Sequence, residues 1–203
     1  YTDWKQLPES ANALFERGAN ESLFFSRSWF ECMTANALDA SHSLVLACVV
    51  SGDRMLAVLP LMESADRKIG YSLRHGFTTH FSILIADDAP AQILTCLAQG
   101  LSQLPVNGLL LEPVADDDSR LNGLKRCLTA AGFNCERHFR HYNWIHRLHG
   151  QSCAEYMAAR PAPLRNTLDR KQRKLEREHG YDIRLFTGEE ALPNDHEIGY
   201  EQV

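Results

Sequence analysis

The sequence contains no apolar run long enough to cross a membrane. Its longest such run, residues 44–50, has the length of a single strand, whereas about 20 residues are needed to span a bilayer. The first residues show neither the basic start nor the apolar stretch of a secretory signal. We therefore expect a cytoplasmic protein with no transmembrane segment.

Cysteine motifs of the kind that bind zinc or build a disulfide framework are also missing. The chain has six cysteines, and no two of them form a C-x-x-C pair. Most lie in apolar or helical stretches, where a free cysteine behaves as a small buried hydrophobic residue. This usage indicates a reducing compartment rather than a secreted protein.

The sequence shows no convincing set of metal ligands or nucleophiles. His138, His141, His146 and His149 follow one another closely, but on a regular strand they would point to opposite faces and not converge on one ion. No G-x-S-x-G motif marks a nucleophilic serine. We expect no metal site, and no catalytic residue can be named. Glu112 ends a predicted strand, and we expect its role to be structural.

The charged residues are divided unevenly along the chain. The formal net charge is −5, yet the segment 160–177 contains seven basic and two acidic residues. That segment therefore carries +5 and the rest of the chain −10. Because the rest is acidic and no recognition motif is present, we expect no nucleic-acid partner.

Hydrophobic periodicity and turn residues predict alternating helices and strands. Helices are expected at 5–17, after a cap at Ser26, and at 152–159 and 163–179. A further helix is expected to open at 87–90, with Asp87 and Asp88 at its positive end, and another at 116–131, with a cap at 116–119 and Gly132 just beyond its end. Strands are expected at 43–50, 55–63, 68–73, 81–86, 108–112 and 181–186, and residues 134–149 are expected to form either two strands or one long bent strand. Pro60 indicates an edge strand or a bulge. This order predicts the α/β class, with a mixed, largely antiparallel sheet and helices on both faces.

The element order resembles the GNAT acyltransferase fold, and two segments resemble the double-GNAT proteins related to Fem transferases and CelD-type accessory proteins. These segments are L-F-F-S-R-S-W at 23–29 and the basic stretch 156–175. The resemblance implies a GNAT-like sheet, with a degenerate N-terminal lobe at 1–150. It further implies a basic helical connector at 151–179 and the start of a truncated second lobe at 180–203. A first strand would precede Trp4.

The same resemblance implies a bacterial N-acyltransferase, which transfers an acyl group from acyl-CoA to an amine acceptor, either a small molecule or a cell-envelope component. The donor loop of that fold is glycine-rich, but residues 85–91 contain no glycine and include Asp87, Asp88 and Pro90. We therefore expect acyl-CoA to bind in the second lobe, with this lobe supplying the acceptor side. The alternative is a non-catalytic lobe that recognises an envelope polysaccharide or a partner protein. A homodimer is left open.

Two regions are candidates for substrate contact. The first is a polar loop whose candidate residues are Arg74, His75, Phe77, Thr78, Thr79 and His80. The resemblance directs this loop toward the acceptor cleft, although an ordinary strand connection explains it equally well. The second is the basic helix, whose candidate residues for an anionic substrate are Arg165, Arg170 and Lys171. Its alternative is a solvated connector that packs on a lobe through Leu164, Leu168 and Leu175.

Overall fold

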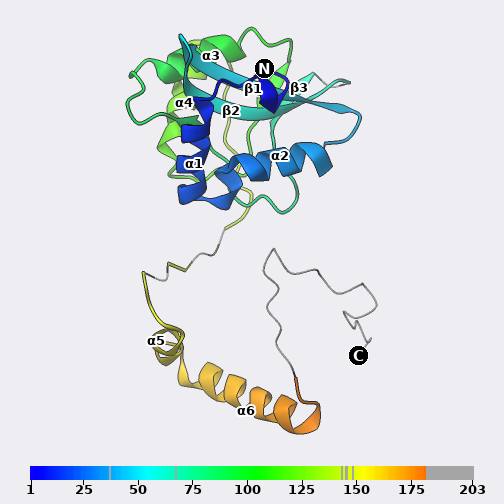
Figure 1. The fold of residues 1–203 in the computed structure, drawn as a ribbon, viewed down its shortest axis with the longest axis vertical. Coiled ribbons are helices and arrows are strands. Elements are labelled where there is room, and N and C mark those ends of the chain that lie inside the picture. The colour runs from blue at the N-terminus through cyan, green and yellow to red at the C-terminus, as the bar shows by residue number, and fades with distance from the viewer. Residues whose placement is uncertain (37, 67, 143, 145, 148, 182–203) are drawn as a thin grey trace. The chain divides into compact units, whose positions relative to one another are not determined.

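The chain forms two compact units, Tyr1–Asn143 and Trp144–Val203 (Figure 1). The computed structural model describes residues 1–36, 38–66, 68–142, 144, 146–147 and 149–181. The sequence placed the division at 150, and its assignment of a lobe, a connector and a second lobe stays a prediction.

The first unit is built on a five-stranded mixed sheet. β1 (His42–Ser51), β2 (Arg54–Ser64) and β3 (Ile69–Ser72) form an antiparallel meander, and β4 (Leu84–Ile85) also pairs antiparallel with β2. β5 (Gly108–Leu110) pairs parallel with β3. The predicted α/β class with a mixed, largely antiparallel sheet is confirmed.

β2 is the central strand and is buried on both faces. Residues 55–61 are all buried, as a continuous apolar strand requires. β1 lies along one edge of β2, while β3 and β4 share the other. The prediction that Pro60 marks an edge strand or a bulge is therefore wrong. Pro60 lies between Val58, which pairs with β4, and Leu61, which pairs with β3, so its missing N–H costs no ladder hydrogen bond.

Helices cover both faces of the sheet, as predicted. They are α1 (Ala11–Glu21), α2 (Arg27–Asn36), α3 (Ile93–Leu101) and α4 (Ser119–Ala130). Side chains alternate along β1, because successive residues of a strand point to opposite faces. Leu44 and Leu46 belong to the cluster that includes residues of α1 and α2, whereas Val45 and Ala47 pack against the cluster that includes residues of α3 and α4.

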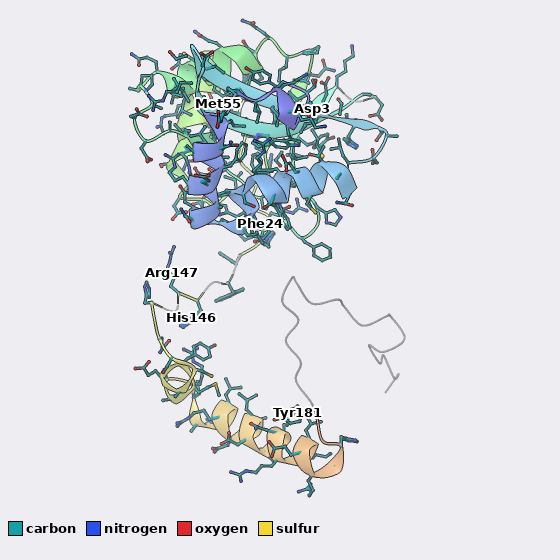
Figure 2. The ribbon with its side chains drawn as sticks, in the orientation of Figure 1. Asp3, Phe24, Met55, His146, Arg147 and Tyr181 are labelled. Carbon is teal, nitrogen blue, oxygen red and sulfur yellow. The ribbon has the colours of Figure 1, made fainter. Side chains whose placement is uncertain are left out.

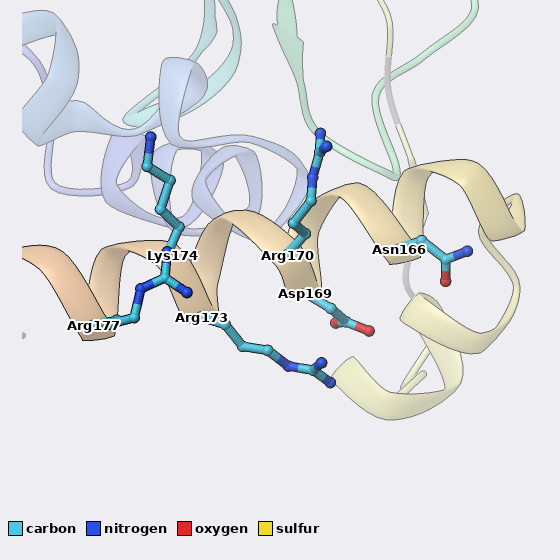
Figure 3. A pocket seen from close by; sticks show the side chains of 6 residues that line it. All are labelled: Asn166, Asp169, Arg170, Arg173, Lys174 and Arg177. Atoms are coloured by element: carbon cyan, nitrogen blue, oxygen red, sulfur yellow. The ribbon is translucent and has the colours of Figure 1, made fainter.

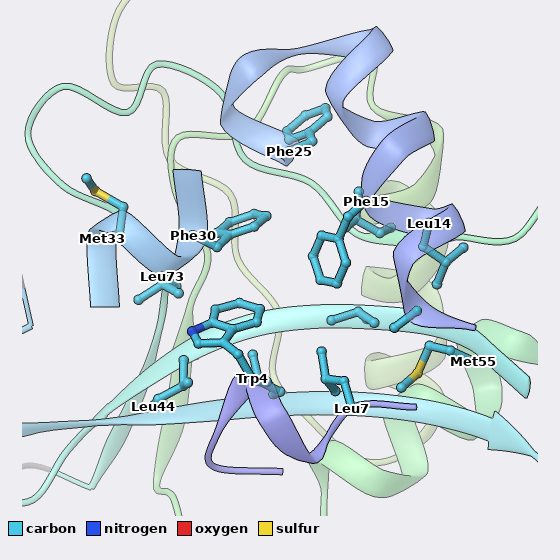
Figure 4. Close-up of a cluster of buried hydrophobic side chains, with 14 residues drawn as sticks. Trp4, Leu7, Leu14, Phe15, Phe25, Phe30, Met33, Leu44, Met55 and Leu73 are labelled. Atoms are coloured by element: carbon cyan, nitrogen blue, oxygen red, sulfur yellow. The ribbon is translucent and has the colours of Figure 1, made fainter. Parts of the chain in front are cut away.

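Aromatic rings fill the core on the α1 and α2 side (Figure 4). The Trp4 ring lies at 6.1 Å from Phe30 in a stacked arrangement and at 5.9 Å from Phe15 in an edge arrangement. Its indole N–H donates to Thr34 Oγ1 at 3.0 Å, which satisfies the one polar atom of the buried ring. The N-terminal segment is thereby fixed against α2.

The helix predicted at 5–17 is wrong at its start. A short 3₁₀-helix, η1 (Trp4–Gln6), is followed by extended backbone at Leu7, and α1 begins only at Ala11. Pro8 explains the break, because the residue before a proline is driven out of the helical region. The Ser10 hydroxyl is engaged elsewhere, since it donates to the Asp53 carbonyl at 2.7 Å and accepts from the Met55 N–H at 2.9 Å.

Predicted helix caps are found at three places. Ser26 Oγ accepts from the Trp29 N–H at 3.2 Å at the start of α2, and Asp118 accepts from the Leu121 N–H at 3.0 Å at the start of α4. Gly132 follows the end of α4 with φ 95°, the left-handed conformation expected there. These local signals were sufficient to place the helix ends.

The second unit contains α5 (Cys153–Ala158) and α6 (Ala162–Glu178). A capping box between Ser152 and Glu155 begins α5. No residue of α6 is buried, unlike the densely packed helices of the first unit (Figure 2). The strand predicted at 181–186 lies outside the described residues except for Tyr181. Within the described part of the chain, no helix is long and apolar enough to span a membrane.

Gly18 of α1 provides a test of the packing, because it allows close approach to the following 3₁₀-helix, η2 (Leu23–Phe25). A Cβ at position 18 would lie 2.8 Å from the Phe25 carbonyl oxygen and 2.7 Å from Leu84 Cδ2. We expect Gly18→Ala to lower the free energy of unfolding, measured in urea, by about 1–3 kcal/mol. Gly100→Ala is the matched control, since nothing lies within 4 Å of its Cβ position. An unchanged urea midpoint for Gly18→Ala would contradict the close approach.

Candidate functional site

The parallel pairing of β3 and β5 places two loops at one edge of the sheet. Both strands end at this edge, so the loops that follow them, 73–83 and 111–118, leave from the same side. The Phe81 N–H donates to the Pro113 carbonyl at 2.8 Å, and the Glu112 N–H donates to Ser72 Oγ at 3.1 Å. Ligands of open α/β sheets bind outside the carboxyl ends of the strands, so the candidate site is built at this edge.

Glu112 joins the two loops to a third segment of the chain. Its two carboxylate oxygens accept hydrogen bonds from Arg74 and from Arg140. Only 19% of the Glu112 side chain and 25% of the Arg74 side chain are exposed. Burial acts to raise the pKa of Glu112, but the hydrogen bonds and positive charges of Arg140 and Arg74 outweigh it and lower the pKa. Glu112 therefore stays ionised with both oxygens engaged by arginines, which suits a structural clamp.

The segment 134–142 is fastened beside the same loop by a second ion pair. Arg137 pairs with the Asp116 carboxylate at 2.7 Å and also donates to the Asp116 carbonyl. The described residues of 134–149 contain no strand, so the strand prediction is wrong there. The segment is held by arginine side chains instead of a backbone ladder. Its Phe139 and Tyr142 rings, 4.9 Å apart, remain largely exposed.

A cavity of about 440 Å³, open to solvent, lies at the start of α4. Its lining comes from α1, from the loop after β3 and from the turn into α4. The lining residues are Glu21, His80, Ala115, Asp117, Asp118, Ser119 and Arg120. With His80 neutral, three carboxylates face one guanidinium, so the cavity has a negative charge.

Arg120 holds the two sides of this cavity together. Its guanidinium donates to both carboxylate oxygens of Glu21, at 2.9 and 3.4 Å, and lies 5.8 Å from the centre of the Phe25 ring. Asp118 caps α4 with one oxygen, and that oxygen lies 3.9 Å from the Arg120 Nε. Asp117 forms no ion pair among the described residues, so its carboxylate is available to a ligand.

His80 is the partly buried titratable group of the cavity. Its ring lies 4.7 Å from the Phe25 ring, and its buried Nε2 has no hydrogen-bond partner within the described part of the chain. Burial lowers the pKa of His80, and the charge of Arg120 adds to this, against the opposing effect of Asp118 and the other nearby acids. The imidazole is therefore neutral at pH 7.

The six candidate residues of the loop point to different places. Arg74 enters the Glu112 clamp, and His80 lines the cavity. Thr78 is buried, and its hydroxyl accepts from the His75 N–H at 3.0 Å, which shapes the loop. Thr79 is exposed, and the exposed Phe77 ring lies 5.3 Å from the His75 ring. The loop thus contributes to the site chiefly through its first and last residues.

The three candidates on the basic helix do not converge either. Successive residues of an α-helix are about 100° apart, which places Arg165 and Lys171 on opposite flanks of the leucine side of α6. Arg170 lies on the other side, where it lines a hollow of about 540 Å³ (Figure 3). That hollow is also lined by Asn166, Asp169, Arg173, Lys174 and Arg177. No single small ligand can contact Arg165, Arg170 and Lys171 together.

The acidic turn before α3 differs from its prediction. Asp87 and Asp88 were expected to lie at the positive end of the helix, but α3 begins only at Ile93. Instead, Asp87 pairs with Arg17 and Asp88 with Arg54. The two acids are therefore offset by two arginines, and repulsion by uncompensated charge is not a reason for this turn to reject acyl-CoA. The missing glycines and Pro90 remain as the physical obstacle.

Metal ligands do not gather in the described residues. No group of three or more His, Cys, Asp or Glu side chains there is arranged to hold an ion. The six cysteines are free, and burial raises the pKa of the Cys48 thiol to about 12, so this thiol is unreactive.

Several residues of the site had no individual signal in the sequence. Glu21, Arg120 and Arg140 are brought to this edge by contacts that span 99 and 28 positions along the chain. Asp117 and Asp118 were recognised only as part of a helix cap. A local pattern can identify the cap, but it does not show which distant loop will lie against it.

The Glu112 clamp predicts a stability effect that depends on pH. We expect Glu112→Gln to lower the free energy of unfolding at pH 7 by about 1–2 kcal/mol, because two arginines lose their shared carboxylate. A lowered folded pKa means that this contribution is complete above the ordinary carboxyl pKa and is lost as the pH falls through the folded pKa. Urea unfolding at a series of pH values should therefore show the difference disappearing in acid. Glu9→Gln, at an exposed carboxylate, is the control, and a pH-independent difference for Glu112→Gln would contradict the clamp.

Comparisons with other proteins leave the site to be interpreted from its own geometry. The chain matches no family model, no curated protein and no solved structure. The likeness to double-GNAT acyltransferases therefore depends on the element order and on the two segments at 23–29 and 156–175, and it stays a hypothesis.

Proposed function

We propose that the first unit binds the amine acceptor of an N-acyl transfer reaction, in the cavity at the start of α4. The observation that carries this proposal is an acidic cavity that also contains a neutral imidazole. The carboxylates of Glu21, Asp117 and Asp118 outnumber the single guanidinium of Arg120, so the cavity attracts a cation such as an alkylammonium group.

His80 supplies the chemistry that an amine acceptor needs. An ammonium ion has no free lone pair, so it must lose a proton before it can attack an acyl group. A neutral imidazole accepts that proton and leaves a nucleophilic amine. The nearby acids then stabilise the imidazolium that forms. Glu112 is not assigned this role because both of its carboxylate oxygens are engaged by Arg74 and Arg140.

The acyl donor is assigned to a separate site. The turn at 85–91 has no glycine, and Asp87 and Asp88 are already paired with Arg17 and Arg54. A loop of this kind offers few free backbone N–H groups to a pyrophosphate. Acyl-CoA, when bound, would supply the activated acyl group, and the first unit would position the amine and take its proton.

The second candidate is a non-catalytic lobe that recognises an envelope polysaccharide or a partner protein. The exposed Phe139 and Tyr142 rings favour it, because they flank Arg140 and offer apolar area beside a fixed ion pair. This candidate requires no amine and no proton acceptor. It therefore predicts that ligand binding is indifferent to the charge of Asp117 and to the titration of His80.

Isothermal titration with matched ligands tests the proposal. Putrescine and glucosamine should bind at least about tenfold more tightly than N,N′-diacetylputrescine and N-acetylglucosamine, which carry no positive charge. Amine binding should weaken as the pH falls through the lowered pKa of His80, because protonation adds a positive charge to the cavity. In His80→Gln this pH dependence should be absent.

Two neighbouring aspartates provide the matched control. Asp117→Asn, in the cavity lining, should lower amine affinity about three- to tenfold, whereas Asp116→Asn, whose carboxylate pairs with Arg137, should not. Equal binding of amines and their N-acetylated counterparts, or equal effects of the two variants, would reject the amine site and favour the non-catalytic lobe.

A further inference from the structure

Within the second unit, the helix α6 carries an apolar stripe that is left partly exposed. Leu164, Leu168 and Leu175 are 46%, 44% and 43% exposed. Their spacing of four and seven residues places them on one line along the helix. No residue of α6 is buried. Leucines arranged in this way are typical of a helix that lies on an apolar layer.

Cations surround this stripe. Arg165 and Lys171 lie about 80° and 40° from the leucine line, on opposite sides, where long side chains can extend past the leucines. The opposite face carries Arg170, Arg173 and Arg177 (Figure 3). Among the described residues Arg170 and Arg173 form no ion pair, whereas Arg177 pairs with Glu178 at 2.9 Å. Six cations of α6 exceed its three acids, Asp169, Glu176 and Glu178, by three, so a net positive charge is spread around the helix.

We propose that α6 binds the surface of an anionic lipid bilayer. The leucine stripe enters the boundary between headgroups and acyl chains, and Arg165 and Lys171 extend to the lipid phosphates. The cations on the face opposite the leucines lie about 10 Å farther from the bilayer. This is roughly one Debye length, so they still contribute to the electrostatic attraction. This binding is peripheral and leaves α6 parallel to the membrane.

The shape of the helix favours a bilayer over other anionic partners. A small phosphate ligand contacts cations from one side only, whereas Arg165, Arg170 and Lys171 point in different directions around α6. A nucleic acid offers phosphates but no apolar layer for the leucines. A groove on an acidic protein needs large anchors, yet the stripe has three leucines and no aromatic residue. A bilayer supplies an apolar layer and a distributed negative charge together.

Vesicle co-sedimentation with the whole chain tests the proposal. The vesicles are phosphatidylcholine alone, or phosphatidylcholine with about one third phosphatidylglycerol. We expect binding to the anionic vesicles only, with an affinity that falls at least about tenfold between low and high salt. The whole chain has a net charge of −5, so anionic vesicles should repel it unless α6 binds them. Binding can therefore be attributed to α6.

Three variants distinguish the parts of the surface. Leu164→Gln/Leu168→Gln/Leu175→Gln removes the stripe with a residue that favours helix, and Arg165→Gln/Lys171→Gln removes the flanking cations. Each should weaken binding at least about fivefold. Lys5→Gln/Arg126→Gln makes the same change of charge at exposed positions of the first unit and should have no effect.

Other outcomes would overturn the proposal. These are absence of binding to anionic vesicles, equal binding to neutral vesicles, or full binding by the leucine variant. Displacement from vesicles by inorganic phosphate would indicate a small-anion site, and tighter binding to a DNA duplex at the same salt would indicate a nucleic acid. Because none of these measurements involves an amine, the result is independent of the acceptor proposal.

Discussion

The burial of β2 on both faces is the constraint on which the first unit depends. A strand that is buried on both sides needs helices above and below it and a hydrogen-bonded neighbour along each edge. β1 satisfies one edge, and the other is divided between β4 and β3. β3 then has a free edge, which the parallel strand β5 occupies. The loops that build the candidate site leave from this last pairing, so the site follows from the sheet order.

Local features of the fold could be predicted from the sequence, and long-range ones could not. The β1–β2 hairpin, the cap at Asp118 and the helix α6 each depend on residues within a few positions of one another. The prediction for Pro60 was wrong because a central strand accepts a proline only where its neighbours need no N–H group. That depends on the registers of β3 and β4 on β2, which arise from tertiary pairing. The start of α1 was misread although Pro8 carried a local signal. The helical periodicity of residues 5–17 predicts a helix there, but Pro8 prevents the helix from starting before it.

The candidate site was predicted as a region and not as an arrangement. The loop 74–80 was identified by its polar composition, but its residues divide between the Glu112 clamp, the solvent and the cavity. Arg74 and His80 lie in different parts of the site because each contacts a different distant residue, Glu112 and Phe25 respectively. Composition can indicate that a loop is polar, whereas the identity of its partners depends on the sheet order that brings the segments together.

The two units present surfaces of opposite charge, and this limits what each can bind. An ammonium group that is attracted by Asp117 and its neighbours would be repelled by the arginines of α6. A lipid phosphate would be attracted by those arginines and repelled by the acidic cavity. A single ligand therefore cannot account for both surfaces. A neutral His80 strengthens this separation, because protonation would cancel part of the negative charge of the cavity. The burial that lowers the pKa of His80 thus keeps the cavity negatively charged at neutral pH, as the proposed amine site requires.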